Sequence, residues 1–201
     1  MRVLYCTDTY PPQVNGVSVV TAHSVAGLSR LGWECAVVAP RYPEAARMIW
    51  KEEEASSGRP PVVVSLPSAP LPGYSEIRLT LPALRPILRL VERFRPDLVH
   101  CATEFTVGRM GQVAAAQASL PLVSSYHTDF SRYAEAYGKS WLRGTVSSYL
   151  KRFHQRSRRV YTPSSVSRED LLRLDVSEVE VWGRGVDAQL YHPGRRSAAG
   201  R

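Results

Sequence analysis

The chain has 201 residues, of which 44% are hydrophobic, and a formal net charge of +8 at pH 7. This hydrophobic content is enough for one sizeable core, and no run of residues is long and apolar enough to span a bilayer. The positive charge would attract nucleic acid, anionic lipid or a phosphorylated substrate, although solubility alone explains it equally well.

Three cysteines, Cys6, Cys35 and Cys101, lie in predicted strands and lack the spacing of metal ligands. We interpret them as buried thiols of a reducing compartment. The chain enters its first predicted strand at once, so we predict no signal peptide. Together these features predict a cytoplasmic protein.

In chain order, the residues first predict a unit of strand, loop, helix and strand. The strands cover residues 2–6 and 33–39, and Gly16 and Gly32 bound the helix between them. Further strands are predicted at 61–66, 77–81, 97–101, 121–126, 160–163 and 179–182. Further helices are predicted at 82–95, after 111 to about 118, 131–137, 141–153 and 166–174. Loops are predicted at 41–60, 67–73 and 103–111. This alternation predicts an α/β fold with a doubly wound, mostly parallel sheet over residues 1–193, and a linker or tail at 194–201.

The loop at residues 7–16 should face a ligand, because ligands of such sheets bind beyond the carboxyl ends of the strands. Backbone N–H groups near Gly16 can hold an anion such as phosphate. The loop lacks the close-spaced glycines of a dinucleotide fingerprint, and no Gly-Lys-Ser/Thr of a P-loop occurs. From the residues alone, a role for Gly16 as a turn glycine after Asn15 is favoured over a role in phosphate contact.

His127 follows the strand predicted at 121–126 and precedes a predicted helix, which places it at the ligand edge of the sheet. Its neighbours Tyr126, Thr128 and Asp129 are polar or amphipathic, whereas a core histidine is more often flanked by aliphatic residues. This context favours a functional role for His127. The other histidines are interpreted as a core residue or a support for the site (His100) and as ordinary helix or surface residues (His23, His154 and His192).

Glu104 also follows a predicted strand, in the stretch HCATEF. A carboxylate at that position would bind sugar hydroxyls or cap the following helix. Ser124 and Ser125 lack the Gly-x-Ser-x-Gly elbow, which argues against hydrolysis by a serine nucleophile. No cluster of His, Cys and Asp has the spacing of metal ligands.

Five stretches of the chain, taken together, resemble the amino-terminal half of family 4 retaining glycosyltransferases of the GT-B fold. They are TDTYPPQVNGV, LSRLGWECAVVAP, DLVHCATEF, SSYHTDF and WGRGVD. Nearest is the bacterial branch of mannosyl- and glycolipid glycosyltransferases, including the phosphatidylinositol mannosyltransferase type. The resemblance covers nearly all of residues 1–193.

The resemblance implies two Rossmann-like domains that face a cleft. The amino-terminal domain mainly holds the acceptor, and the carboxyl-terminal domain mainly holds the nucleotide-sugar with a Lys/Arg pair and a Glu-x7-Glu motif. The chain stops at Arg201, where the second domain should begin, so the donor-binding motifs are expected outside these residues. The chain is then an isolated amino-terminal domain or a fragment.

The resemblance also implies roles for particular residues. Gly16 matches the glycine whose amide contacts the donor diphosphate, and His127 matches the catalytic histidine at the transferred sugar. Residues with implied acceptor or sugar contacts are Asp8, Tyr10, Asn15, Glu104, Tyr126, Thr128 and Asp129. Gly185 and Asp187 match the hinge near the interdomain linker. The resemblance implies no metal ligand and no cofactor, since the nucleotide-sugar is the donor substrate.

The function implied for the intact enzyme is transfer of a hexose, mannose or glucose, from a UDP- or GDP-sugar to an acceptor hydroxyl with retention. The acceptor is expected to be a glycolipid or phospholipid head group, and this chain alone is expected to be inactive. Alternatives are an acceptor-binding domain that needs a separate donor-domain chain, and a GT-B-like epimerase or phosphorylase. The missing glycine fingerprint argues against a nicotinamide enzyme, and the absence of a motif of interleaved aromatic and basic residues argues against a nucleic-acid binder.

Two basic segments suggest contact with a membrane surface. The first is Arg85, Arg89 and Arg93, and the second is residues 139–159 with Trp141. Both suit anionic lipid heads on the inner face of the membrane, and a solvated helix face is the alternative explanation.

Overall fold

The computed structural model describes residues 1–43, 59–71, 74–127, 143–183, 185, 192 and 194. Its strands are β1 (Arg2–Cys6), β2 (Glu34–Pro40), β3 (Val62–Leu66), β4 (Ser68–Leu71), β5 (Tyr74–Thr80), β6 (Leu98–Cys101), β7 (Leu122–Ser125), β8 (Arg159–Thr162) and β9 (Val179–Val181). Its helices are α1 (Gly16–Arg30), α3 (Leu84–Phe94), α4 (Thr106–Gln117), α6 (Arg143–His154) and α7 (Ser165–Arg173). The predicted helix at 131–137 lies outside the described residues.

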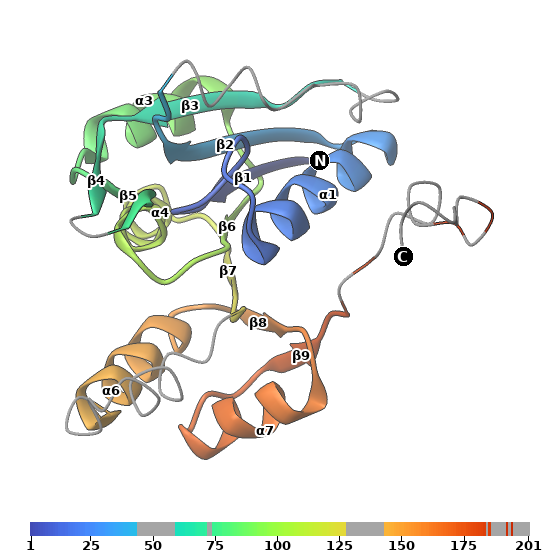
Figure 1. Cartoon of the computed structure of the whole chain (residues 1–201), viewed down its shortest axis with the longest axis vertical. Helices are drawn as coiled ribbons and strands as arrows, with labels where there is room; N and C mark the ends of the chain where they lie inside the picture. The colour runs from blue at the N-terminus through green and yellow to red at the C-terminus, as the bar shows by residue number, and fades with distance from the viewer. Residues whose placement is uncertain are drawn as a thin grey trace.

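Seven strands form one sheet in the order β3-β2-β1-β6-β7-β8-β9, and every neighbouring pair is parallel. The predicted doubly wound, mostly parallel sheet is therefore confirmed. Figure 1 shows β1 to β3 at one end of the sheet and β8 and β9 at the other, beside α6 and α7. The strand order reverses between β1 and β6, and ligands of such sheets bind at that reversal.

The core forms on both faces of the sheet because successive strand residues point to opposite sides. Leu4 and Cys6 of β1 pack in the cluster that includes residues of α3 and α4. Val3 and Tyr5 pack in the cluster that includes residues of α1. A third cluster joins β8 and β9 to α6 and α7, with Val160, Leu150 and Leu171 among its members. Helix α1 thus lies on one face and the later helices on the other.

The Pro-rich stretch 67–73 was predicted as loop, and this prediction is wrong for part of it. Residues Ser68–Leu71 form β4, which pairs antiparallel with β5 in a separate two-stranded sheet. Pro70 is tolerated because both strands of such a pair are edges, where a missing N–H need not break a ladder. The edge strand predicted at 77–81 is confirmed, with an earlier start at Tyr74. Helix α4 begins at Thr106, inside the connection predicted at 103–111.

Close contact between α4 and the sheet requires glycine at position 111. A Cβ on Gly111 would lie 2.7 Å from both Cβ and Sγ of Cys6 and 3.0 Å from Sγ of Cys101. We predict that Gly111→Ala lowers the free energy of unfolding by about 1–3 kcal/mol, because the neighbouring core must shift. Urea denaturation measures this change.

The matched control is Gly144→Ala in α6, where an added Cβ meets nothing within 4 Å. This substitution should raise the free energy of unfolding by about 0.4–1 kcal/mol, because it restricts the unfolded chain. Equal stability of the two variants would contradict the packing described here.

Candidate functional site

Asp8 joins the loop after β1 to the loop after β6, at the reversal of the sheet. Its carboxylate accepts hydrogen bonds from Thr103 Oγ1 at 2.6 Å, Val107 N at 2.8 Å and Gly108 N at 3.4 Å. Burial raises the pKa of Asp8, and these donors partly offset that rise. Asp8, rather than Glu104, therefore caps α4. Its contact with an acceptor stays a prediction.

Asn15 is the N-cap of α1. Its Oδ1 accepts from Ser18 N at 2.9 Å, and its Nδ2 donates to Thr9 Oγ1 at 2.7 Å. The exposed Gly16 follows as the first helical residue. The helix itself supplies no acceptor for the first-turn amides of Gly16 and Val17, so this end of α1 can receive an anion.

Tyr10 is half-buried beside the α1-side core, and its backbone N–H donates to Tyr42 Oη at 3.4 Å. Burial raises the pKa of Tyr10 to about 12. The side chain is thus a neutral phenol at physiological pH. Its contact with an acceptor or sugar, like that of Asn15, stays a prediction.

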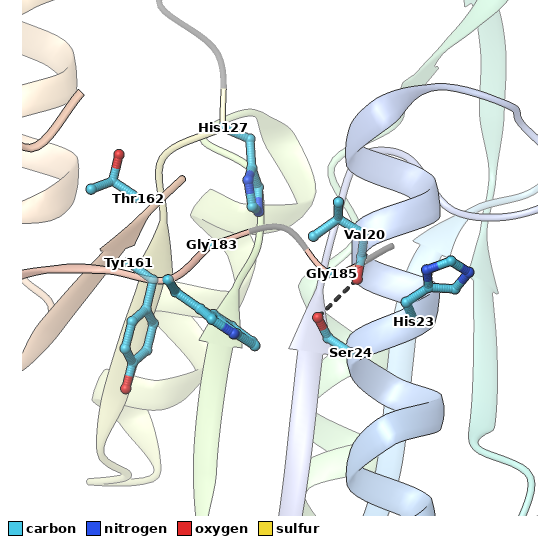
Figure 2. Close-up of a pocket in the computed structure, with 9 residues that line it drawn as sticks. Val20, His23, Ser24, His127, Tyr161, Thr162, Gly183 and Gly185 are labelled. Atoms are coloured by element: carbon cyan, nitrogen blue, oxygen red, sulfur yellow. Dashed lines mark hydrogen bonds between the residues drawn. The ribbon is translucent and has the colours of Figure 1, made fainter. Parts of the chain in front are cut away.

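A pocket of about 200 Å³ lies between α1 and the carboxyl ends of β7 and β8. Figure 2 shows His127 pointing into the space that faces α1, with Val20 and Ser24 across from it. Ser24 Oγ donates to the carbonyl of Val20 at 2.8 Å. The lining residues are Val20, His23, Ser24, His127, Tyr161, Thr162, Trp182, Gly183 and Gly185.

Aromatic rings form one wall of this pocket and continue into the core. The Trp182 and Tyr161 rings meet edge to face, with centroids 5.2 Å apart. His100 lies behind them, with its ring centroid 6.1 Å from that of Trp182 and 4.6 Å from that of Tyr5. Trp182 remains 42% exposed. The pocket thus combines an apolar ring surface with imidazole and hydroxyl groups, which suits a ligand with an apolar face and hydroxyls, such as a hexose.

The predicted site residues that the structure describes divide between the pocket and its surroundings. His127 and Gly185 line the pocket. Tyr126 is buried beside α6, in the cluster with Leu150. Thr128, Asp129 and Asp187 lie outside the described residues. The roles of all these residues in binding stay predictions.

Glu104 is 3% exposed, so its side chain is buried beneath the surface. Its Oε1 lies 3.5 Å from His154 Nε2, and Tyr149 Oη donates to its backbone carbonyl. Burial raises the pKa of Glu104, while the nearby imidazole of His154 lowers it. A direct contact of this carboxylate with sugar remains a prediction that would require movement of its surroundings.

Two histidines have surroundings that were not predicted. His154, predicted as an ordinary helix or surface residue, is fully buried, because the inner face of α6 turns it toward β7. His23, placed in the same class, lines the pocket from α1. His100 is confirmed as a core residue at 4% exposure, and its Nε2 lies 2.7 Å from Ser125 Oγ.

Sequence reasoning missed most of the pocket wall, including Tyr161 and Trp182. The available signal was Trp182, which ends the strand predicted at 179–182 and opens the stretch WGRGVD, whereas Tyr161 lies inside the strand predicted at 160–163. Among the residues that the structure describes, no three His, Cys, Asp or Glu side chains gather closely enough to hold a metal ion. Within the same residues, no helix has the length and apolarity needed to cross a membrane. The metal-independence implied by the resemblance remains a prediction.

An open parallel sheet with a polar and aromatic pocket beyond its strand ends defines a ligand-binding α/β domain. The chain belongs to Glycosyltransferase Family 4, whose sequence pattern matches residues 14–190. This match confirms the resemblance drawn from the five sequence stretches.

Curated relatives align with nearly the whole chain. It is 30% identical over 199 residues to a GDP-mannose-dependent alpha-mannosyltransferase of Corynebacterium glutamicum, covering 99% of this chain and 46% of the relative. It is 31% identical over 198 residues to a protein of the same name from Mycobacterium tuberculosis, covering 98% and 50%. The chain is 26% identical over 172 residues to an alpha-monoglucosyldiacylglycerol synthase of Streptococcus pneumoniae, and the match covers 84% of this chain and 36% of the relative. The chain thus spans about half the length of the first two.

Solved structures share the fold at low sequence identity. Sucrose-phosphate synthase of Thermosynechococcus elongatus superposes with a TM-score of 0.64 and 12% identity, covering 96% of this chain and 50% of that one. UDP-GlcNAc 2-epimerase of Methanocaldococcus jannaschii superposes with a TM-score of 0.58 and 13% identity, covering 92% of this chain and 46% of that one. These likenesses show the fold alone.

His100 should make stability depend on pH. Burial, and then the charge of nearby His127, lower the pKa of His100 to about 3. Between that value and the ordinary pKa of about 6.5, the unfolded chain binds a proton that the folded chain does not. The contribution of His100 to the free energy of unfolding is therefore complete above pH 6.5 and declines as the pH falls toward 3, by up to about 1.4 kcal/mol per pH unit.

His100→Gln removes this titration, so the stability advantage of the wild type over the variant should shrink as the pH is lowered from 7 to 4.5. Urea denaturation at a series of pH values measures the difference. Parallel stability profiles for the two proteins would contradict the buried, neutral state of His100.

Proposed function

We propose that the protein containing this chain transfers a hexose from a nucleotide-sugar to the hydroxyl of a glycolipid or phospholipid head group, with retention at the anomeric carbon. The observation that carries the proposal is His127 in a pocket at the ligand edge of the sheet, in a chain of Glycosyltransferase Family 4. Among UDP- and GDP-sugars, the names of the mannosyltransferase relatives favour GDP-mannose. The name of the synthase supports a lipid acceptor.

In the proposed reaction, the acceptor oxygen bonds to the anomeric carbon while the bond from that carbon to the diphosphate oxygen breaks. The departing phosphate oxygen takes the acceptor proton late, so no dedicated base is required. Negative charge grows on the diphosphate, and preorganised donors must stabilise it. The amides of Gly16 and Val17 and the dipole of α1 would supply part of this stabilisation without a metal ion.

His127 would orient the transferred sugar and stabilise charge near its ring. The opposite wall offers His23 and Ser24 to hydroxyl groups, and Trp182 offers an apolar surface to a sugar face. Specificity for the base would come mainly from the second domain, beyond these residues. The likeness to the epimerase is one of fold, so it favours no second activity.

Replacement of His127 tests this assignment. His127→Ala in the full-length protein should lower turnover about 10²–10³-fold, because one electrostatic contact to the transition state is lost. The measurement is transfer of labelled mannose from GDP-mannose, or glucose from UDP-glucose, to a diacylglycerol-based glycolipid. Thermal unfolding should stay close to that of the wild type, because His127 is only half-buried.

The matched control is His192→Ala, which removes an exposed imidazole that does not line the pocket. This control should keep wild-type turnover. Wild-type turnover in His127→Ala would contradict the role of His127. Full activity of this chain alone, without a second domain, would contradict the proposed need for a second domain that binds the nucleotide.

We further propose that the protein works in the cytoplasm, at the surface of an anionic membrane. Helix α3 exposes Arg85, Arg89 and Arg93, while Leu81 just before it is 57% exposed. In the second basic segment, Lys151 and Arg159 already bind the carboxylates of Asp175 and Glu180. Helix α3 is therefore the better candidate for lipid contact.

Reversal of three charges on α3 should abolish this contact. A variant with Arg85→Glu, Arg89→Glu and Arg93→Glu should no longer pellet with phosphatidylglycerol vesicles at low salt, because its attraction to anionic lipid is lost. The same charge change at three scattered exposed arginines, Arg30, Arg59 and Arg173, should have a much smaller effect. Equal pelleting of both variants would contradict a membrane site on α3.

A further inference from the structure

The end of β7 carries His127 into the pocket. The backbone N–H of Tyr126 donates to the carbonyl of Tyr161 at 2.8 Å, and His127 follows where the chain leaves the sheet. At that point the hydrogen bonds between neighbouring strands no longer fix the direction of the backbone. The direction of His127 therefore depends on how the two preceding serines, Ser124 and Ser125, are held.

On the face of the sheet that carries α1, a buried histidine holds Ser125. His100 Nε2 lies 2.7 Å from Ser125 Oγ, and the ring of His100 packs against Tyr5. Ser125 is 1% exposed and His100 is 4% exposed. Because both groups are shielded from water, neither can exchange this hydrogen bond for one to solvent.

On the opposite face, a second buried histidine holds Ser124. His154 Nδ1 lies 2.9 Å from Ser124 Oγ, and Ser157 Oγ donates to Ser124 Oγ at 2.8 Å. The Oγ of Ser124 and Nδ1 of His154 share this hydrogen bond, and Nε2 on the other side of the imidazole ring faces Glu104 Oε1 at 3.5 Å. The ring of Tyr126 meets that of His154 edge to face, with centroids 5.7 Å apart.

We propose that His100 and His154 are positioning residues that hold the end of β7 from its two faces and so fix how His127 enters the pocket. The four residues His100, Ser125, Ser124 and His154 form what we call the β7 clamp. Consecutive strand residues point to opposite faces, so two adjacent serines present one hydroxyl to each imidazole. The proposal rests on the function proposed above for His127.

The chain Ser124–His154–Glu104 has the residue types of a hydrolytic triad, but its burial excludes that reading. Ser124 and His154 are both 0% exposed, so no substrate carbonyl can reach the serine. Neither residue is among those that line the pocket. The network therefore acts on the strand that carries His127 and not on a ligand of its own.

The test removes one hydroxyl from each half of the clamp, in the full-length protein. Ser125→Ala and Ser124→Ala should each lower kcat about 10–100-fold with KM changed less than twofold, because small misplacement of a reacting group is costly. Each should also shift or broaden the imidazole signals of His127 in spectra of protein labelled with ¹⁵N-histidine. Ser125→Thr, which keeps the hydroxyl and suits a strand, should restore both properties.

The matched control is Ser29→Ala, which removes a hydroxyl at the far end of α1 from a serine that is 9% exposed. It should leave kcat and the His127 signals unchanged. Circular dichroism confirms that each variant is folded, and the imidazole spectra remain informative when activity is low.

Two outcomes separate the clamp from the function proposed for His127. Unchanged His127 signals and unchanged kcat in both serine variants, beside a large loss in His127→Ala, would overturn the clamp alone. Shifted His127 signals in the serine variants, beside wild-type turnover in His127→Ala, would support the clamp and overturn the proposed role of His127. Equal losses in Ser125→Ala and Ser125→Thr would also overturn the clamp, since the hydroxyl would then be irrelevant.

Discussion

The structure depends on a junction between two loops 95 residues apart, at the point where the parallel sheet reverses its strand order. Asp8 makes this junction, because its carboxylate accepts from the Thr103 hydroxyl and from the amides that begin α4. Burial of a carboxylate is costly unless donors surround it, and here a hydroxyl and a helix N-terminus provide them. The start of α1, to whose first-turn amides we assign the diphosphate, follows the same loop and is therefore placed at the same edge of the sheet.

The two faces of the sheet carry different groups at that edge. The face that carries α1 holds the pocket, with His23 and Ser24 on the helix and Trp182 on the aromatic wall. The other face holds the buried contact between Glu104 and His154, which reaches the same strand end through Ser124. The pocket and the contact between Glu104 and His154 thus meet β7 from opposite sides, and His100 supports Ser125 on the face of the pocket. In the β7 clamp that we propose, these buried contacts fix the direction of the half-buried His127 from outside the pocket.

The sequence predicted the alternation of strands and helices because apolar periodicity and Gly or Pro boundaries are local signals. It placed His127 correctly for the same reason, since a residue after a buried strand lies at the ligand edge. Trp182 was missed because its wall forms through the pairing of β8 with β9, which no local pattern encodes. The capping role of Asp8 and the burial of His154 were missed because both depend on which loop and strand a residue meets. Strand β4 was missed because prolines signal loops except on edges.

We propose above that the end of α1 and the pocket beside it receive the diphosphate and the hexose of a nucleotide-sugar. A crystal structure of the full-length protein with bound GDP-mannose would locate both groups. We expect the diphosphate within hydrogen-bond distance of the Gly16 amide, and the mannose ring between His127 and the wall formed by Trp182. A nucleotide-sugar bound with its diphosphate away from α1 and its hexose outside this pocket would overturn the proposed roles of α1 and of the pocket.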